Sequence, residues 1–266
     1  MTIPQILLTN DDGVISPGLW AAAEVLSKLG QVTVAAPRDQ ATGAGRSVPV
    51  GSDGIIRRET VTFNGQIWQA YAIGGSPAQV TLHAILEIMN ERPDLVVSGI
   101  NYGENVSTAI GASGTVGAAL ESASLGIPSL AVSLQTEKRH HYSHSNEVDF
   151  SVAAHFTAMF GRLLLERAMP RGVDLLKVDV PSNATITTPW AWTRLSTSKY
   201  YVTIKPERTS WDAPGRLGYE VNPDIENEPQ GTDVYALLKE RIVSVTPLTL
   251  DMTAHVTRQE LEHFAR

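Results

Sequence analysis

The sequence predicts an α/β fold built on a mainly parallel sheet, followed by an extended, β-rich C-terminal arm. Three observations predict it. A strand, a helix and a second strand follow one another within residues 5–37, which forms a βαβ unit with parallel strands. Apolar stretches at 95–99, 128–133 and 175–180 continue this alternation with helices. Beyond Pro181 the helical periodicity fades, and tryptophan, tyrosine, threonine and proline become frequent.

The first βαβ unit has well-marked boundaries. Residues 5–10 form a short apolar strand that ends at two adjacent aspartates. Ser16 and Pro17 supply a helix N-cap and a first-turn proline, and Gly30 supplies the stop. The second strand covers residues 32–37. The apolar positions of the helix recur at helical spacing: Leu19, Ala22, Ala23, Leu26 and Leu29.

The middle of the chain alternates between sheet and helix. Residues 55–73 predict an antiparallel excursion, and Ser76 with Pro77 caps a helix that follows it. A helix rich in small residues is expected from Ala118 to Leu125, and a long amphipathic helix over residues 148–169.

Three parts are expected along the chain: a catalytic core over residues 1–182, an extended arm over 183–230, and a segment that returns to the core over 231–266. Within this last segment, a helix over 232–239 and a strand over 242–245 are expected, and a short helix from Thr257 closes the chain.

Composition limits the functions that fit. The chain has 266 residues, a formal net charge of −7 and no cysteine. The negative charge argues against a nucleic-acid polymer as partner, but it does not exclude a small anionic substrate held by a metal. Without thiolates, any metal site must use oxygen or imidazole ligands. No signal peptide and no run of ~18 apolar residues is present, so a cytoplasmic protein without a membrane partner is expected.

Polar side chains follow three strands of the predicted sheet. Asp11 and Asp12 end the first strand, Thr42 lies in the loop after the second, and Asn101 follows the strand at 95–99. Carboxyl ends of parallel strands meet at one sheet edge, where ligands bind. Carboxylate, hydroxyl and amide oxygens suit Mg²⁺, Mn²⁺ or Ca²⁺. Two aspartates before a helix can equally cap a turn, and both interpretations stay open.

A glycine-rich stretch over residues 111–117 opens a helix, and its free N–H groups suit a phosphate, although close helix packing also favours such a loop. The chain lacks a Walker lysine, a G-x-G-x-x-G after the first strand and a G-x-S-x-G elbow. P-loop, dinucleotide-binding and serine-hydrolase functions are therefore disfavoured. The histidines at 140, 141 and 144 predict a solvated loop rather than a metal site.

In combination, these motifs resemble the survival protein SurE family. The resemblance rests on residues 8–13 (LTNDDG), 97–105 (VSGINYGEN), 113–119 (SGTVGAA) and the C-terminal pair of runs at 231–233 and 243–248. It spans nearly the whole chain, more densely up to residue 135. It implies a Rossmann-like three-layer core and a metal-dependent 5′-nucleotidase, a phosphomonoesterase acting on nucleoside 5′- and 3′-monophosphates. Family members often also cleave short polyphosphate.

The resemblance also implies the site. One divalent cation per subunit, Mg²⁺ or Mn²⁺, would be held by Asp11, Asp12, Thr42 and Asn101. The family usually has serine where this chain has Thr42, and its D-R-N-Q-S-G-A loop is here R-D-Q-A-T-G-A at 38–44. Dimers or tetramers that exchange the C-terminal arm are implied as well.

The expected mechanism is attack on phosphorus by a water that Asp11 or Asp12 positions or deprotonates. The phosphate oxygens would be held by a second set: Asn10, Gly43, Ser113, Gly114 and Thr115. Two alternatives stay open. One is a non-catalytic nucleotide-binding or signalling module with the same acidic pocket. The other is a phosphotransfer receiver, for which the expected lysine on a later strand is not evident.

Overall fold

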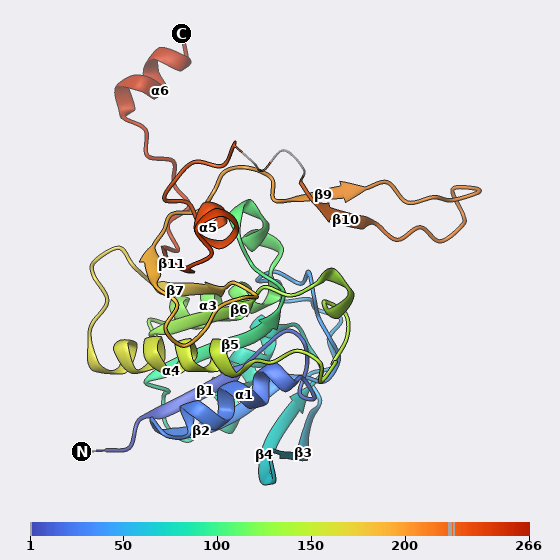
Figure 1. The fold of residues 1–266 in the computed structure, drawn as a ribbon, viewed down its shortest axis with the longest axis vertical. Helices are drawn as coiled ribbons and strands as arrows, with labels where there is room; N and C mark the ends of the chain where they lie inside the picture. Colours follow the sequence, from blue (N-terminus) through green and yellow to red (C-terminus); the bar gives the residue numbers. More distant parts are fainter. Residues whose placement is uncertain (1, 223–224, 226) are drawn as a thin grey trace.

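The computed structural model describes residues 2–222, 225 and 227–266, and its centre is a nine-stranded sheet with helices on both faces (Figure 1). The strand order is β3-β4-β2-β1-β5-β6-β7-β11-β8. Helices α1 (Pro17–Leu26) and α4 (Ser151–Glu166) pack together on one face, and α2 (Pro77–His83) and α3 (Gly114–Ser124) pack together on the other. The expected three-layer α/β architecture with a mainly parallel sheet is confirmed.

Five central strands run parallel and carry apolar side chains toward both faces. They are β1 (Gln5–Thr9), β2 (Gln31–Pro37), β5 (Leu95–Tyr102), β6 (Ser129–Leu134) and β7 (Leu175–Val180). Because helices cover both faces, these strands are continuous apolar runs rather than alternating ones. After β1 the chain builds outward through β2 and then returns to β5 on the other side of β1. This reversal of strand order is where open α/β sheets bind their ligands.

Three helices differ from their expected bounds. Helix α1 starts at the expected Pro17, without a side-chain hydrogen bond at the Ser16 cap, and it ends at Leu26 with Ser27 as C-cap instead of continuing to Gly30. Helix α3 begins at Gly114 instead of Ala118, with the Ser113 side chain accepting a hydrogen bond from the N–H of Val116. Helix α4 covers Ser151–Glu166 instead of 148–169, and Arg167 is already extended. Helix α2 begins with the expected Ser76 cap, a full capping box with Gln79, and continues as a π-helical turn over Ala84–Ile88.

The sheet is extended at both ends by antiparallel pairs. At one end, β3 (Ile56–Phe63) and β4 (Gln66–Ile73) form the expected antiparallel excursion, and β4 pairs with β2 in parallel. At the other end, β11 (Val243–Leu248) runs antiparallel to β7, and the short β8 (Trp190–Trp192) pairs with β11. The first part of the 183–230 segment therefore belongs to the central sheet.

A hairpin and two short helices complete the C-terminal part. Strands β9 (Tyr201–Ile204) and β10 (Gly218–Val221) form a separate two-stranded sheet that projects from the core (Figure 1). Helix α5 (Asp233–Tyr235) returns to the core and continues as a π-helical turn over Ala236–Glu240, whereas α6 (Arg258–Phe264) buries none of its residues. None of the helices in the described ranges is long and apolar enough to cross a membrane.

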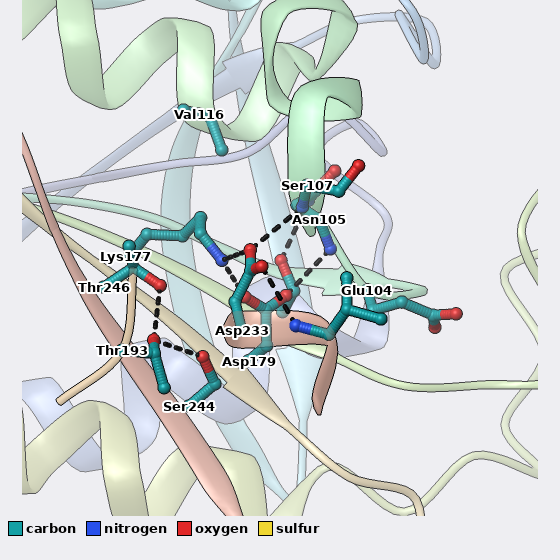
Figure 2. A network of polar contacts seen from close by, with 12 residues as sticks. Glu104, Asn105, Ser107, Val116, Lys177, Asp179, Thr193, Asp233, Ser244 and Thr246 are labelled. Carbon is teal, nitrogen blue, oxygen red and sulfur yellow. Dashed lines mark hydrogen bonds and ion pairs between the residues drawn. The ribbon is translucent and has the colours of Figure 1, made fainter. Parts of the chain in front are cut away.

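A buried ionic cluster fastens the loop after β5 to the C-terminal segment (Figure 2). The ammonium group of Lys177 on β7 contacts the carboxylates of Asp179 and, at 3.2 Å, Asp233, and all three side chains are fully buried. Asp179 accepts a hydrogen bond from the N–H of Asn105 at 2.8 Å. Asp233 accepts one from the N–H of Ser107 at 2.9 Å. The loop that leaves the ligand-binding edge of the sheet is thus held by two charged groups.

Candidate metal and phosphate site

The two aspartates at the end of β1 are almost fully buried, each with 2% of its surface exposed. The Asp11 carboxylate accepts a hydrogen bond of 2.5 Å from the hydroxyl of Thr115, in the first turn of α3. Burial raises the pKa of Asp11, and hydrogen bonds from Thr115 and from the backbone of Gly114 lower it. Asp11 therefore contacts the N-terminus of α3, a helix about one hundred residues further along the chain. It caps a helix end and still faces the cavity described below.

The close fit of α3 on Asp11 requires a glycine. A Cβ at Gly114 would lie 2.7 Å from the Cβ of Asp11 and 2.9 Å from one of its carboxylate oxygens. The absence of a side chain at position 114 thus lets the positive end of α3 approach the carboxylate directly.

The Asp12 carboxylate is held on both oxygens. One accepts a hydrogen bond from the side-chain amide of Gln40 at 2.9 Å, and the other accepts one from the N–H of Tyr102 at 3.2 Å. Burial and the neighbouring negative charge of Asp11 raise its pKa well above the usual range. Across the part of the chain that the structure describes, neither aspartate forms a salt bridge. Two adjacent buried carboxylates without a cationic side chain fit a bound cation.

A cavity of about 270 Å³ lies beside these carboxylates. Five of the predicted site residues line it: Asp11, Thr42, Gly43, Asn101 and Ser113. The side-chain amide of Asn101 donates to the carbonyl of Gly103 at 2.8 Å and to that of Tyr102 at 3.3 Å, so its nitrogen is engaged and its oxygen remains as the acceptor.

The orientation of Asn101 depends on an irregularity in β5. The pairing of β5 with β6 shifts register between Ser98 and Asn101. Gly99, between them, has φ +133°, and a Cβ there would lie 2.3 Å from the carbonyl oxygen of Val132. Such an irregularity re-aims the side chains that follow it, here at the end of the strand where Asn101 meets the cavity.

The other predicted site residues lie behind the cavity wall. Asn10 is fully buried, and its amide exchanges two hydrogen bonds with the backbone of Gly13, at 3.0 and 3.1 Å. The hydroxyl of Thr115 is engaged with Asp11. Asp12 and Gly114 do not line the cavity either. Asn10, Gly114 and Thr115 hold the turn and the helix end that carry the groups facing the cavity, and Asp12 adjoins Asp11, which lines it.

The histidine-containing segment is not the solvated loop that the sequence predicts. His140 and His141 are buried, and His144 hydrogen-bonds the carbonyl of Asp12 at 2.7 Å. The Gln40 amide bridges the Asp12 carboxylate and the carbonyl of His141. The correction has a physical cause: this segment lies across the end of β1 and supplies hydrogen bonds to its loop.

Sequence reasoning also missed four cavity-lining residues: His141, Tyr142, Tyr201 and Tyr219. They come from the histidine-containing segment and from the hairpin β9–β10. The high aromatic content of the arm pointed toward Tyr201 and Tyr219, whereas the histidine-containing run that carries His141 and Tyr142 is predicted from the sequence as a solvated loop.

The donor set is consistent with a hard divalent cation. Among the described residues, no group of three or more histidine, cysteine, aspartate or glutamate side chains could hold a metal ion. A site at this cavity must therefore add neutral oxygens to the two carboxylates, and Thr42 and Asn101 carry such oxygens. Carboxylate, hydroxyl and amide oxygens together suit Mg²⁺ or Mn²⁺.

Comparison with known proteins points in the same direction. A family model described as Survival protein SurE matches residues 6–202. The 5′-nucleotidase SurE of Thermococcus gammatolerans is 44% identical over 264 residues, covering 97% of this chain and 95% of that protein. The 5′-nucleotidase SurE of Methanothrix thermoacetophila is 42% identical over 263 residues, covering 97% of both. The crystal structure of SurE protein from Aquifex aeolicus superposes with a TM-score of 0.76 at 28% identity, over 99% of this chain and 100% of that one. The chain therefore belongs to the survival protein SurE family.

Proposed function

We propose that this protein is a divalent-metal-dependent phosphomonoesterase that hydrolyses nucleoside 5′-monophosphates, and also 3′-monophosphates, to nucleoside and phosphate. One observation carries the proposal: two adjacent, buried carboxylates, Asp11 and Asp12, have no cationic partner among the described residues and lie at a cavity at the switch point of the sheet. Relatives that match nearly the full chain are named 5′-nucleotidases, which supports the same activity. Short polyphosphate is a further candidate substrate.

Four residues would hold one Mg²⁺ or Mn²⁺ per subunit: Asp11, Asp12, Thr42 and Asn101. When bound, the cation supplies charge neutralisation at the phosphate and a lowered pKa for a coordinated water. The chain orients these ligands through a second layer of contacts. Thr115 fixes the Asp11 carboxylate, and Gln40 with the Tyr102 N–H fixes that of Asp12.

The phosphate would lie at the N-terminal end of α3, an eleven-residue helix whose positive end favours an anion. Gly43 and Ser113 line the cavity and would contact its oxygens directly. Asn10, Gly114 and Thr115 would contribute by holding the turn after β1 and the helix end in place. Asp11 or Asp12 would position the attacking water and accept its proton.

The experiment that tests this function measures phosphate release from AMP, GMP and p-nitrophenyl phosphate with Mg²⁺ or Mn²⁺, with and without EDTA. We expect release from the nucleotides that EDTA abolishes and that added metal restores. Absence of release under all of these conditions would favour the non-catalytic nucleotide-binding module instead.

A threonine at position 42 is expected to serve as well as a serine. Thr42 is exposed in the loop after β2, where an added methyl group meets little resistance. Thr42→Ser should therefore change kcat/KM by less than about threefold, whereas Thr42→Val, which removes the oxygen at nearly the same volume, should lower it by about tenfold or more. A Thr42→Ser variant without activity would show that the methyl group itself matters.

We also propose that the 183–230 segment, between the core (1–182) and the returning segment (231–266), connects subunits in a homodimer or homotetramer. The hairpin β9–β10 projects from the core and exposes Trp211 and Leu217, with 91% and 71% of their surfaces accessible. Exposed apolar residues on a projecting hairpin favour burial against a second copy.

A further inference from the structure

The cavity beside Asp11 has two chemically different sides. One carries the oxygen donors Asp11, Thr42 and Asn101, and the other carries His141, Tyr142, Tyr201 and Tyr219. A metal and a phosphate account for the first side. Neither accounts for four aromatic rings, since a phosphate has no apolar surface to bury against them.

The aromatic side is held in a fixed position by His141. Its Nε2 lies 3.4 Å from the carbonyl oxygen of Thr136, and its Nδ1 lies 2.8 Å from the hydroxyl of Tyr219. Because burial lowers the pKa of His141 and a carbonyl can only accept, Nε2 carries the proton and the Tyr219 hydroxyl donates to Nδ1. The imidazole also packs on Gly103, where a Cβ would lie 2.7 Å from the ring.

Tyr219 and Tyr201 are ordered by further contacts. Their rings meet edge to face, with centroids 5.2 Å apart at 76°. The ammonium of Lys138 lies 4.9 Å from the centroid of the Tyr219 ring and hydrogen-bonds the Tyr219 carbonyl. The Tyr201 hydroxyl lies 3.4 Å from the carbonyl oxygen of Glu104. Both rings are thus in place before any ligand arrives.

Tyr142 is different, because 63% of its surface is exposed although its ring lies only 6.4 Å from that of Tyr219. It lines the cavity, and most of its side chain is not covered by the protein. The segment that carries it is tied to the carboxylates, through the Gln40 bridge between His141 and Asp12 and through His144 on the Asp12 carbonyl. The distance from the aromatic side to the acidic side is therefore fixed by hydrogen bonds.

We propose that Tyr142, supported by Tyr219 and Tyr201, forms the surface on which the nucleobase of a nucleoside monophosphate stacks. This inference rests on the proposed function and deepens it. It predicts that the site selects nucleotides over phosphate esters without a base. Since the hydroxyls of Tyr201 and Tyr219 already have partners within the protein, recognition is by ring stacking, so purine and pyrimidine nucleotides are both accepted.

The test compares kcat/KM for AMP with kcat/KM for ribose 5-phosphate, which has the same phosphate ester and no base. The wild-type protein should prefer AMP, and Tyr142→Ala should reduce this preference about tenfold, in line with the usual contribution of one aromatic ring to base stacking. Tyr142→Phe keeps the ring and should keep the preference. Phe264→Ala, which removes an exposed aromatic side chain of α6 outside the cavity, is the control.

Binding of adenosine, followed by isothermal titration calorimetry, supplies a measurement that does not depend on turnover. If no ester is hydrolysed, but adenosine binds and Tyr142→Ala lowers its affinity, the result supports the base site and contradicts the proposed phosphatase function. Equal kcat/KM values of the wild-type protein for AMP and ribose 5-phosphate would overturn the base site. So would an unchanged preference in the Tyr142→Ala variant.

Discussion

Replacing Asp12 with asparagine is expected to abolish metal-dependent phosphate release and to leave the metal-free protein about as stable as the wild type. Loss of a carboxylate ligand removes half of the negative charge offered to the cation, and we expect at least about a hundredfold loss of activity. The folded state, by contrast, loses a buried charge that it tolerates poorly. Burial and the charge of Asp11 both raise the pKa of Asp12, so its ionised form is disfavoured without a cation.

Asp12→Asn changes the free energy of unfolding through two small effects of opposite sign. An asparagine at position 12 keeps one of the two hydrogen bonds from Gln40 and the Tyr102 N–H, and loses the other, which costs about 1 kcal/mol. Relief of the repulsion from Asp11 offsets this. Thermal melts followed by circular dichroism in EDTA, beside calorimetric titration with Mn²⁺, separate the two effects. Asp212→Asn, on an exposed hairpin position, is the control.

Two results would contradict the assignment. An Asp12→Asn variant that still binds Mn²⁺ and releases phosphate would show that Asp12 is not a ligand. A variant that has lost activity and also melts at a much lower temperature than the wild type would show that Asp12 is needed mainly for the stability of the fold.

The sheet could be predicted because each of its strands is marked by a local sequence pattern. The strands β1 and β7 are apolar runs bounded by turn residues, and α1 begins at the expected Pro17, although it ends at Leu26, before the expected stop at Gly30. The start of α3 could not be predicted in the same way. Its first turn, Gly114-Thr115-Val116-Gly117, has low helix propensity, and Asp11, distant in sequence, accepts the hydrogen bonds that stabilise it.

The same distinction applies to the candidate site. Asp11, Thr42, Asn101 and Ser113 could be expected together because each follows a strand that ends at one edge of the sheet. His141 and Tyr219 could not, because they reach the site from a loop and from a hairpin whose position no local pattern specifies. The turn at Asn10 shows a different limit, since its composition does not distinguish a side chain that faces a ligand from one that holds its own backbone.

The second large effect is expected from Lys177→Met. The substitution keeps the apolar stem but removes the ammonium group that lies between Asp179 and Asp233, in a site with no exposed surface. Breaking a buried ion pair by removing one partner typically costs about 3–5 kcal/mol, because the remaining charge is neither solvated nor paired. Urea unfolding at neutral pH should therefore show a loss of this size, while Lys205→Met, on an exposed position, should show almost none.

The pH dependence of that loss identifies its cause. In the wild-type protein burial raises the pKa of Asp179 to about 6, although Lys177 acts to lower it. Without Lys177 the folded pKa rises further above its unfolded value. A carboxyl with a raised folded pKa lowers stability as the pH rises above its unfolded pKa, and the extra loss in the variant develops above pH 6, the pKa of Asp179 in the wild-type protein. The deficit of Lys177→Met should accordingly be largest above pH 6 and shrink toward pH 4, where Asp179 takes up a proton. A deficit that is the same at all pH values would instead point to lost packing.

The cluster also connects stability to the site. Asp179 and Asp233 accept hydrogen bonds from the backbone N–H groups of Asn105 and Ser107 (Figure 2). Both residues lie in the loop that leaves β5 after Tyr102, the neighbour of Asn101. Displacement of either carboxylate weakens this attachment. We therefore expect Lys177→Met to weaken Mn²⁺ binding under conditions where the variant is still fully folded, because Asn101 is less firmly positioned. Unchanged Mn²⁺ affinity in the folded variant would show that the cluster stabilises the fold without orienting the ligand.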